Sequence, residues 1–311
     1  MTETVDRLGA HGAQAVHRRY VADIVRLHSE LDFRGLADHL IGQPIHFRQD
    51  DQYELITLTV LDDQLPLRYL NGVLGFRMAQ YLRLGWMSER LVYEGAMFRE
   101  TVDHPDGVQN LHTVTLSSRT GRIHGYIGLA CTKDPAPLPL DDPARYRFAT
   151  ENAHDIDLVS RYAAPGLTTH QAFEIKRFVR DLEMQAGKAA EAVPWELLLS
   201  LGKSIVRGDG RIGIMLGDAK EHRALRHFRL TGFDVHVETG TSPRLPETDV
   251  LAPIYDQDIV AVPFIAPVPP DLDDFMNVIQ DSLAADAGIA PMVKRLMQLK
   301  GRRRRQNTEG S

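Results

Sequence analysis

Cysteine is almost missing from this sequence, which contains only Cys131. A single cysteine excludes an internal disulfide and any zinc site that needs several thiolates. The thirteen histidines are scattered without the spacing of a metal-binding motif, so we expect no metal. A reducing compartment fits this composition, and Cys131 itself is expected to be a small buried apolar residue rather than a nucleophile.

Long apolar runs are missing as well. Nowhere do 18 apolar residues follow one another, and the first residues, MTETVDRLGAHGAQ, contain no run of signal-peptide length. We therefore expect no transmembrane segment and a cytoplasmic location. The sequence also lacks a Walker loop, a G-x-S-x-G elbow and an H-E-x-x-H motif, which argues against the enzyme classes that use them.

Charge is distributed unevenly along the chain. The formal net charge is −6, but without seven basic residues near the C-terminus it would be −13, with 29 basic against 42 acidic residues. An acidic body lacks the extended basic face that nucleic acid requires, so we expect no nucleic-acid partner. The basic end is either a solvated tail or a docking site for an acidic partner or an anionic lipid surface. Its basic residues are Lys294, Arg295, Lys300, Arg302, Arg303, Arg304 and Arg305.

Length and composition predict a folded chain of enzyme size. The 311 residues are 43% hydrophobic and 25% charged, which is ordinary for a globular protein with a sizeable core. We predict a helical N-terminal extension at 1–50, one α/β domain at 51–268, a helical C-terminal extension at 269–300, and a basic disordered tail at 301–311.

Hydrophobic periodicity predicts a mixed α/β architecture. Helical spacing indicates helices at 13–41, 66–85, 193–207, 219–231 and across 271–299. Alternation and β-branched residues indicate strands at 53–61, 111–117, 123–132, 171–179, 211–216, 233–238 and 258–265. This order predicts a mixed sheet with helices on both faces. In the strand at 171–179, the apolar residues Phe173 and Ile175 alternate with polar ones, but Phe178 breaks this alternation, so we expect the strand to fade into irregular structure. The long connection before it, 133–169, has a length typical of functional loops.

Two segments resemble a known family. ALRHFRLTGFDVHVE (224–238) resembles the late helix, loop and strand of GNAT (Gcn5-related) N-acyltransferases, and FEIKRFVRD (173–181) resembles the E-x-x-R-F stretch of acyl-homoserine lactone synthases. The resemblance covers about 53 to 265 and implies a GNAT-like fold. It implies an N-acyltransferase that moves an acyl group from acyl-CoA or the acyl-phosphopantetheine of an acyl-carrier protein to the amine of a small molecule, an amino acid or a derivative.

The same resemblance implies catalytic residues. Glu174 and Arg177 match the glutamate and arginine of that stretch, which would organise the acceptor pocket; a surface ion pair is the alternative. Glu174, His112 and His124 are the candidates for the base that removes the ammonium proton, although each histidine would also fit a structural role. A further acidic group would bind the acceptor's ammonium or lie in a solvated loop: Glu94, Glu100, Asp103 and Asp106.

The residues expected to bind the donor are Phe178, Val179, Gly187, Ala189 and Phe228. Gly187 and Ala189 fit a phosphate-binding loop because small residues let backbone amides approach a phosphate, or they merely relax the chain there. Phe228 stands where many GNAT enzymes carry a tyrosine acting as general acid. A phenyl ring has no proton to donate, so protonation of the leaving thiolate is unassigned.

Two other functions stay open from the sequence. Phe228 and the imperfect phosphate loop at Gly187 and Ala189 favour a GNAT-fold module without catalytic activity, which binds acyl thioesters or has a regulatory role. A third reading is an acyltransferase for protein lysine, which would need an open groove. The run Gly128-Leu129-Ala130-Cys131-Thr132 departs from the R-L-L-P-T run of the lactone synthases, and this departure leaves the acceptor undefined.

Overall fold

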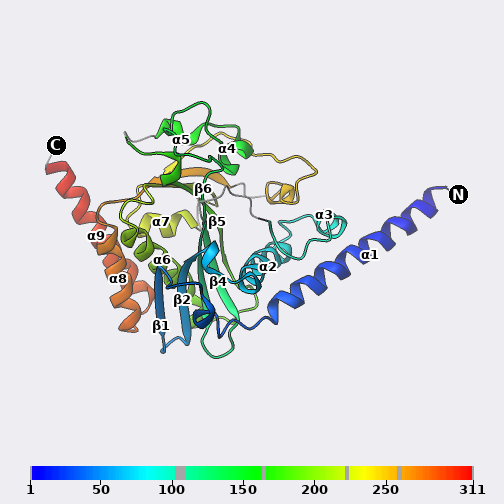
Figure 1. Cartoon of the computed structure of the whole chain (residues 1–311), viewed down its shortest axis with the longest axis horizontal. Helices are drawn as coiled ribbons and strands as arrows, with labels where there is room; N and C mark the ends of the chain where they lie inside the picture. The colour runs from blue at the N-terminus through cyan, green and yellow to red at the C-terminus, as the bar shows by residue number, and fades with distance from the viewer. Residues whose placement is uncertain (1, 102–109, 163–165, 221–223, 258–260, 310–311) are drawn as a thin grey trace.

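A computed structural model describes residues 2–101, 110–162, 166–220, 224–257 and 261–309, with side chains for all of these except 2–13 and 306–309. Its described residues form an eight-stranded sheet in the order β1-β2-β3-β4-β5-β6-β8-β7 (Figure 1). Only β5 and β6 pair in parallel; the other neighbours are antiparallel. The strands are β1 (His46–Asp50), β2 (Leu55–Leu61), β3 (Leu111–Ser117), β4 (Ile123–Ala130), β5 (Ala172–Arg180), β6 (Ile214–Ala219), β7 (His236–Val237) and β8 (Val262–Pro267).

Helices cover both faces of the sheet, which confirms the predicted α/β class (Figure 1). On one face lie α1 (Thr2–Ser29), α2 (Leu67–Arg83) and α3 (Glu89–Glu94). The other face is covered by α6 (Lys188–Arg207), α8 (Leu272–Ala284) and α9 (Ile289–Glu309). The remaining helices are α4 (Ala149–His154), α5 (Leu158–Arg161), α7 (Arg226–Leu230) and the 3-10 turns η1 (Ala37–His39), η2 (Asp62–Gln64), η3 (Thr169–Gln171) and η5 (Ala252–Ile254).

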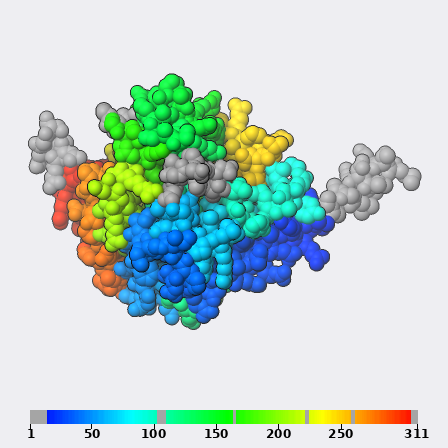
Figure 2. Space-filling view, viewed as in Figure 1, coloured from blue at the N-terminus to red at the C-terminus, as the bar shows by residue number. Residues whose placement is uncertain are grey.

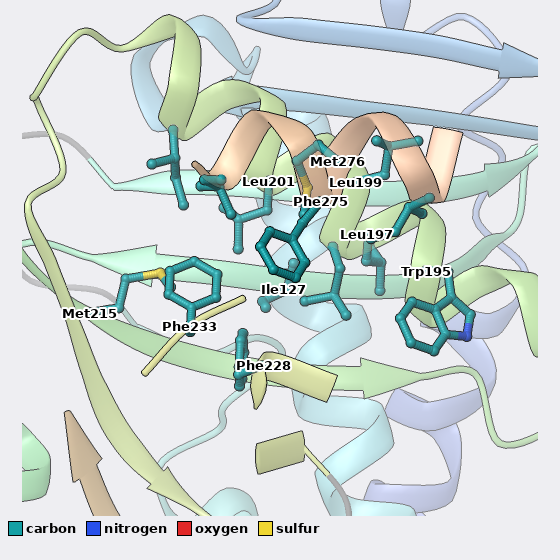
Figure 3. Packing of buried hydrophobic residues seen from close by; sticks show 14 of the residues in the cluster. Ile127, Trp195, Leu197, Leu199, Leu201, Met215, Phe228, Phe233, Phe275 and Met276 are labelled. Carbon is teal, nitrogen blue, oxygen red and sulfur yellow. The ribbon is translucent and has the colours of Figure 1, made fainter. Parts of the chain in front are cut away.

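Each face of the sheet has its own hydrophobic core. On the α6 side, Trp195 and Leu197 of α6 and Phe275 and Met276 of α8 gather over Ile127 of β4 (Figure 3). On the α2 side the core is a separate cluster that includes Val114 and Tyr126. Because side chains of a strand alternate between the two faces, this division tells which face each strand residue serves.

Helix α6 begins five residues before the predicted start at 193, and Pro194 lies inside it. A proline inside a helix leaves the carbonyl four residues earlier without its N–H donor. Here that carbonyl belongs to Ala190, and Arg180 Nη1 donates to it over 3.2 Å. The strand before the helix thus supplies the missing donor, which the local sequence does not reveal.

Three other predictions differ from the structure. Strand β1 lies inside the stretch expected to be a helical extension and pairs with β2. Helix α7 is five residues long, much shorter than the predicted 219–231, of which 221–223 lie outside the described residues. The predicted disordered tail is wrong for 301–309, because α9 continues to Glu309. Lys300 and Arg303 hold α9 by donating to the carbonyls of Arg229 (2.9 Å) and Gly232 (2.7 Å).

Candidate active site

A β-bulge interrupts strand β5 at its centre. Lys176 pairs with Gly128 and Val179 with Tyr126, so two residues of β5 stand opposite the single residue Ile127 of β4. The first of them, Arg177, has φ +63°, a left-handed conformation that a non-glycine residue adopts only where its surroundings impose it. An extra residue shifts the alternation of side chains between the faces.

This shift explains the irregular apolar spacing in the sequence. Phe173 and Ile175 before the bulge, and Phe178 as its second residue, all contact the core on the α6 side. Val179 instead joins the core on the α2 side. The segment 171–179, which the sequence predicted to fade into irregular structure, is therefore part of a continuous strand with one inserted residue.

Strand β5 separates from β6 after Glu174, before the bulge. The two strands pair only over Ala172–Glu174 and Ile214–Leu216. The gap between them opens into a cavity of about 440 Å³, which we call the interstrand cavity. Its apolar walls come from α2, β5, α6, α7 and β8, and they include Ile175, Phe178, Val179, Leu197, Phe228 and Phe264.

A second cavity of about 390 Å³, the sheet-face cavity, lies on the α2 side of β3, β4 and β5. His112, Tyr126 and Gly128 line it, together with Tyr146 and Phe148 of the connection before α4. The segments that carry α4 and α5 (green) and η5 (yellow) cover the top of the body (Figure 2). The two cavities share five lining residues, so they meet along β5: Ala149, Glu174, Lys176, Arg177 and Asp249.

Glu174 is buried, and all of its acceptor capacity is occupied. Its Oε1 accepts from the backbone N–H (2.8 Å) and the hydroxyl (2.5 Å) of Thr150, and its Oε2 accepts from the N–H of Ala149 (3.2 Å). Lys176 Nζ lies 2.7 Å from Oε2. Because these amides begin α4, Glu174 fixes the cover of the site to the sheet. It pairs with Lys176, whereas the sequence had paired it with Arg177.

Arg177 pairs instead with Glu100, which reaches β5 from the chain after α3. Arg177 Nε donates to both carboxylate oxygens of Glu100 (2.9 and 3.1 Å), and Arg77 Nη2 of α2 donates to Oε2 (2.7 Å). Burial alone would raise the pKa of the Glu100 carboxyl, but the two arginines outweigh it and hold that pKa below its usual range. Arg177 also lies over the ring of Tyr81, 4.5 Å from its centroid.

The same network extends to His112. Tyr126 receives a hydrogen bond from Arg77 Nη1 (3.3 Å), and its hydroxyl lies 2.8 Å from His112 Nδ1. Burial raises the pKa of Tyr126, which keeps this phenol protonated. In the tautomer whose Nδ1–H donates to Tyr126, the other ring nitrogen of His112 is a proton acceptor. His112 therefore lines the sheet-face cavity as an oriented imidazole.

A second polar group lies in the interstrand cavity. Tyr255, which follows η5, donates its hydroxyl proton to Asp218 of β6, and His154 Nε2 is 3.6 Å from the same carboxylate oxygen. His154 is held from its other side, where Nδ1 lies 2.8 Å from Thr241 Oγ1. Burial and the neighbouring Asp218 raise the pKa of Tyr255. The phenol is thus held protonated, with its single proton directed to Asp218, in the cavity where Phe228 has no polar group.

Other predicted site residues lie elsewhere. His124 lines neither cavity; its Nδ1 is 3.8 Å from Asp181. Gly187 and Ala189 lie at the N-terminus of α6, also outside the two cavities. Phe228 lines the interstrand cavity but is 99% buried, with its ring against Phe264 and Phe233.

The acidic residues proposed to bind the acceptor's ammonium group do not lie together. Glu94 is exposed and pairs with Arg90, whereas Glu100 is neutralised by two arginines. Asp103 and Asp106 lie outside the described residues. Cys131 lines the sheet-face cavity as a buried free thiol, and burial raises its pKa to about 12, so it is a poor nucleophile at neutral pH.

Sequence reasoning missed Arg77, Tyr126, Asp218 and Tyr255. Arg77 lies within the helix predicted at 66–85 and Tyr126 within the strand predicted at 123–132, and nothing in either pattern indicated that these side chains belong to a site. One signal was available: Arg77 is a charged residue among otherwise largely apolar neighbours on α2, and it is 96% buried. Asp218 and Tyr255 carried no local signal.

Among the described residues, no three His, Cys, Asp or Glu side chains gather as metal ligands. Within the same parts of the chain, no helix combines the length and apolar character that a membrane crossing requires.

No protein-family model and no curated protein matches the sequence. Among solved structures, the fold is similar to the AHL synthase LasI (TM-score 0.45, 14% identity, 71% of this chain and 94% of that one). It is also similar to TofI in a complex with an inhibitor and MTA (TM-score 0.42, 15% identity, 71% and 96%). An acetyltransferase from Streptococcus agalactiae is a third (TM-score 0.34, 10% identity, 67% and 98%).

Proposed function

We propose that this protein is an N-acyltransferase that transfers an acyl group from a thioester to the amine of an amino acid or a derivative. The observation that supports it is the meeting of two cavities, about 440 and about 390 Å³, along the bulged strand β5. A two-substrate transfer needs two pockets that open on one point. Lys176 and Arg177 stand at that point and line both cavities.

The interstrand cavity suits the thioester. Beyond Glu174, the edge of β5 that faces β6 has no ladder partner among the described residues, so its backbone groups are available to an extended amide-bearing chain such as phosphopantetheine. The apolar side chains of α6, α7 and β8 would enclose the acyl group. Backbone N–H groups at the bulge would stabilise the oxyanion that forms when the carbonyl is attacked.

The sheet-face cavity suits an amine that also carries a carboxylate. Five basic side chains line it against three acidic ones, and Glu100 and Glu174 are already engaged by arginines and a lysine. The surplus positive charge favours a ligand with a negative group over a simple amine. The basic residues are Arg77, Lys133, Arg147, Lys176 and Arg177.

His112 is the proposed base. The neutral amine attacks the thioester carbon, the carbon–sulfur bond breaks, and the ammonium proton passes to the imidazole. Tyr255 would turn its hydroxyl away from Asp218 to donate a hydrogen bond to the leaving thiolate, which then takes up a proton from water. Glu174 and Arg177 act as positioning residues, because the contacts of each are used to hold the site together.

Thiol release from acyl-CoA and acyl-carrier-protein thioesters, with pooled amino acids as acceptors, tests the proposal. We expect amine-dependent release, and a fall of about 100-fold or more in kcat for His112→Asn, a usual cost of losing a general base. His39→Asn is the matched control, since His39 is exposed and bonds only its own loop at Gly35. Absence of release from every thioester, or equal kcat for the two variants, would contradict the proposal.

The buried, proton-free Phe228 supports a second function, an acyl-thioester-binding module without turnover. Calorimetric titration with acyl-CoA distinguishes the two. Binding without thiol release in the presence of every acceptor would establish the module, whereas binding with release rejects it.

A further inference from the structure

Charge pairing inside the sheet-face cavity leaves two of the described side chains without an ionic partner. Eight charged residues line this cavity, and six of them form ion pairs. The pairs are Glu100 with Arg77 and Arg177, Glu174 with Lys176, and Arg147 with Asp155, which lies outside the cavity. Asp249 and Lys133 have no ion pair among the described residues, so one carboxylate and one ammonium group remain to bind a ligand.

Asp249 lies in the long segment between β7 and β8 (yellow in Figure 2), and its backbone is fixed by neighbouring chain. Its N–H donates to the carbonyl of Pro246 (2.8 Å), and the carbonyl of the next residue, Val250, accepts from the N–H of Ser88 (2.9 Å). Oδ1 of Asp249 accepts from the N–H of Leu251 (2.8 Å), and no described residue donates to Oδ2. The partly buried carboxylate is therefore held in position with one oxygen left for a ligand.

The position of Asp249 is the junction of the two cavities, both of which it lines. Glu174 is the other carboxylate at this junction, but its oxygens already accept from Thr150, Ala149 and Lys176. An amine that attacks a thioester in the interstrand cavity must lie at the same junction. Because an ammonium group needs hydrogen-bond acceptors, Asp249 marks the place of the acceptor's nitrogen.

Lys133 stands at a different part of the site. It follows the end of β4, is exposed, and lines the sheet-face cavity but not the interstrand cavity. Its ammonium group is a point charge with three donors, which suits a carboxylate. A ligand whose nitrogen lies at Asp249 would therefore extend its negative group into the sheet-face cavity, towards Lys133.

We propose that Asp249 and Lys133 bind the acceptor as a zwitterionic amino acid, with its ammonium group at Asp249 and its carboxylate at Lys133. This inference rests on the proposed function and adds the two residues that select and orient the acceptor. Both are binding residues, and the proton acceptor of the reaction is still His112.

The opposite signs of the two groups decide the class of ligand. A diamine would leave Lys133 facing a like charge, and a dicarboxylate would do the same at Asp249. A ligand with one positive and one negative group satisfies both, and it adds no net charge to the cavity.

The test is calorimetric titration of the full chain with the proteinogenic L-amino acids, each tested singly. The amino acid that binds is then compared with two analogues, the 2-hydroxy acid that lacks its ammonium group and the amino alcohol that lacks its carboxylate. Asp249→Asn should weaken binding of the amino acid about 10-fold or more and change binding of the hydroxy acid less than threefold. Lys133→Gln should weaken the amino acid by a similar factor and spare the amino alcohol.

Matched controls remove the same charges outside the two cavities. Glu247→Gln lies on the same segment as Asp249, and Lys294→Gln lies on α9; both positions are exposed. Each control should change the affinity for the amino acid less than twofold. A variant at Asp249 or Lys133 that weakens all three ligands equally would show a structural effect and overturn the assignment, as would failure of every amino acid to bind the native chain.

Two outcomes separate this inference from the proposed function. Because binding needs no turnover, amino-acid binding that depends on Asp249 and Lys133 without any thiol release rejects the acyl transfer and keeps the zwitterion site. Amine-dependent thiol release with the same KM for the amino acid in both variants does the reverse. An effect of Asp249→Asn alone would mean that the acceptor's carboxylate is not at Lys133, and the zwitterion proposal fails.

Discussion

Two groups of arginines in this protein differ in burial and in partners. Arg77 and Arg177 are buried against Glu100, and each of their contacts fixes a side chain at the junction of the two cavities. Arg226 of α7 and Arg304 of α9 are exposed and line a groove of about 580 Å³ between these two helices. Burial with a carboxylate makes an arginine a positioning residue, whereas an exposed arginine remains in contact with water and contributes little to the packing of the site.

The largest expected effect comes from removing the shared carboxylate. Glu100→Gln leaves Arg77 and Arg177 buried together with their charge uncompensated, so the free energy of unfolding should fall by about 3–5 kcal/mol. Urea denaturation measures it. The control Glu94→Gln breaks an exposed pair with Arg90 and should cost less than about 0.5 kcal/mol. Equal losses for the two variants would show that burial makes no difference.

A buried imidazole extends the comparison to pH. Burial, helped by Arg207, Lys203 and Arg48, lowers the pKa of His46 from 6.5 to about 4. The unfolded chain therefore takes up this proton first as the pH falls. Stability from neutral His46 is fully present above pH 6.5 and is lost as the pH falls towards 4, by up to about 3 kcal/mol. His46→Gln should flatten the dependence of the urea midpoint on pH across this window; an unchanged slope would contradict the assignment.

A smaller effect is expected at the Tyr255–Asp218 pair. Tyr255→Phe removes the hydrogen-bond donor proposed for the leaving thiolate, so kcat should fall about 10-fold with little change in KM, about 1.4 kcal/mol at the transition state. Tyr162→Phe removes a phenol that also bonds a carboxylate, Glu238, but lines neither cavity. A matching loss in this control, or an effect on KM alone, would reject the role of Tyr255.

The smallest effect concerns a single exposed cation. Arg302→Gln on α9 should change the free energy of unfolding by less than about 0.5 kcal/mol. Urea denaturation measures this change at low salt and again near ~0.5 M salt, where charges several ångströms apart are screened. A loss above about 1 kcal/mol at either salt concentration would contradict the expectation for an exposed cation.

Local sequence signals located much of the fold. Alternation at 111–117 and 123–132 predicted the strands β3 and β4, which pair with each other, and Gly121 in the turn between them has φ +70°, a conformation that favours glycine. The spacing of Phe173, Ile175 and Phe178 recorded the bulge of β5, although it was read as the strand fading. Glu174 and Arg177, which the E-x-x-R-F resemblance singled out, both lie on β5 and line the two cavities, and their catalytic role stays a prediction.

The partners of these residues could not be predicted in the same way. Arg177 meets Glu100 and Glu174 meets Thr150, contacts that span 77 and 24 positions of the chain. Lys300 and Arg303 of α9 likewise donate to the carbonyls of Arg229 and Gly232, 71 positions earlier. Hydrophobic period and turn chemistry act over a few residues and carry no information about such pairs.

The sequence by itself determined the α/β class, the neighbouring strands β3 and β4, and the acidic body with its basic end. Tertiary structure alone decided which carboxylate neutralises which arginine, where β5 and β6 separate, and that the basic end is a helix packed beside α7. The physical reason is range: backbone propensities and side-chain alternation are local, whereas charge pairing and cavity formation depend on which distant segments the packed cores bring together.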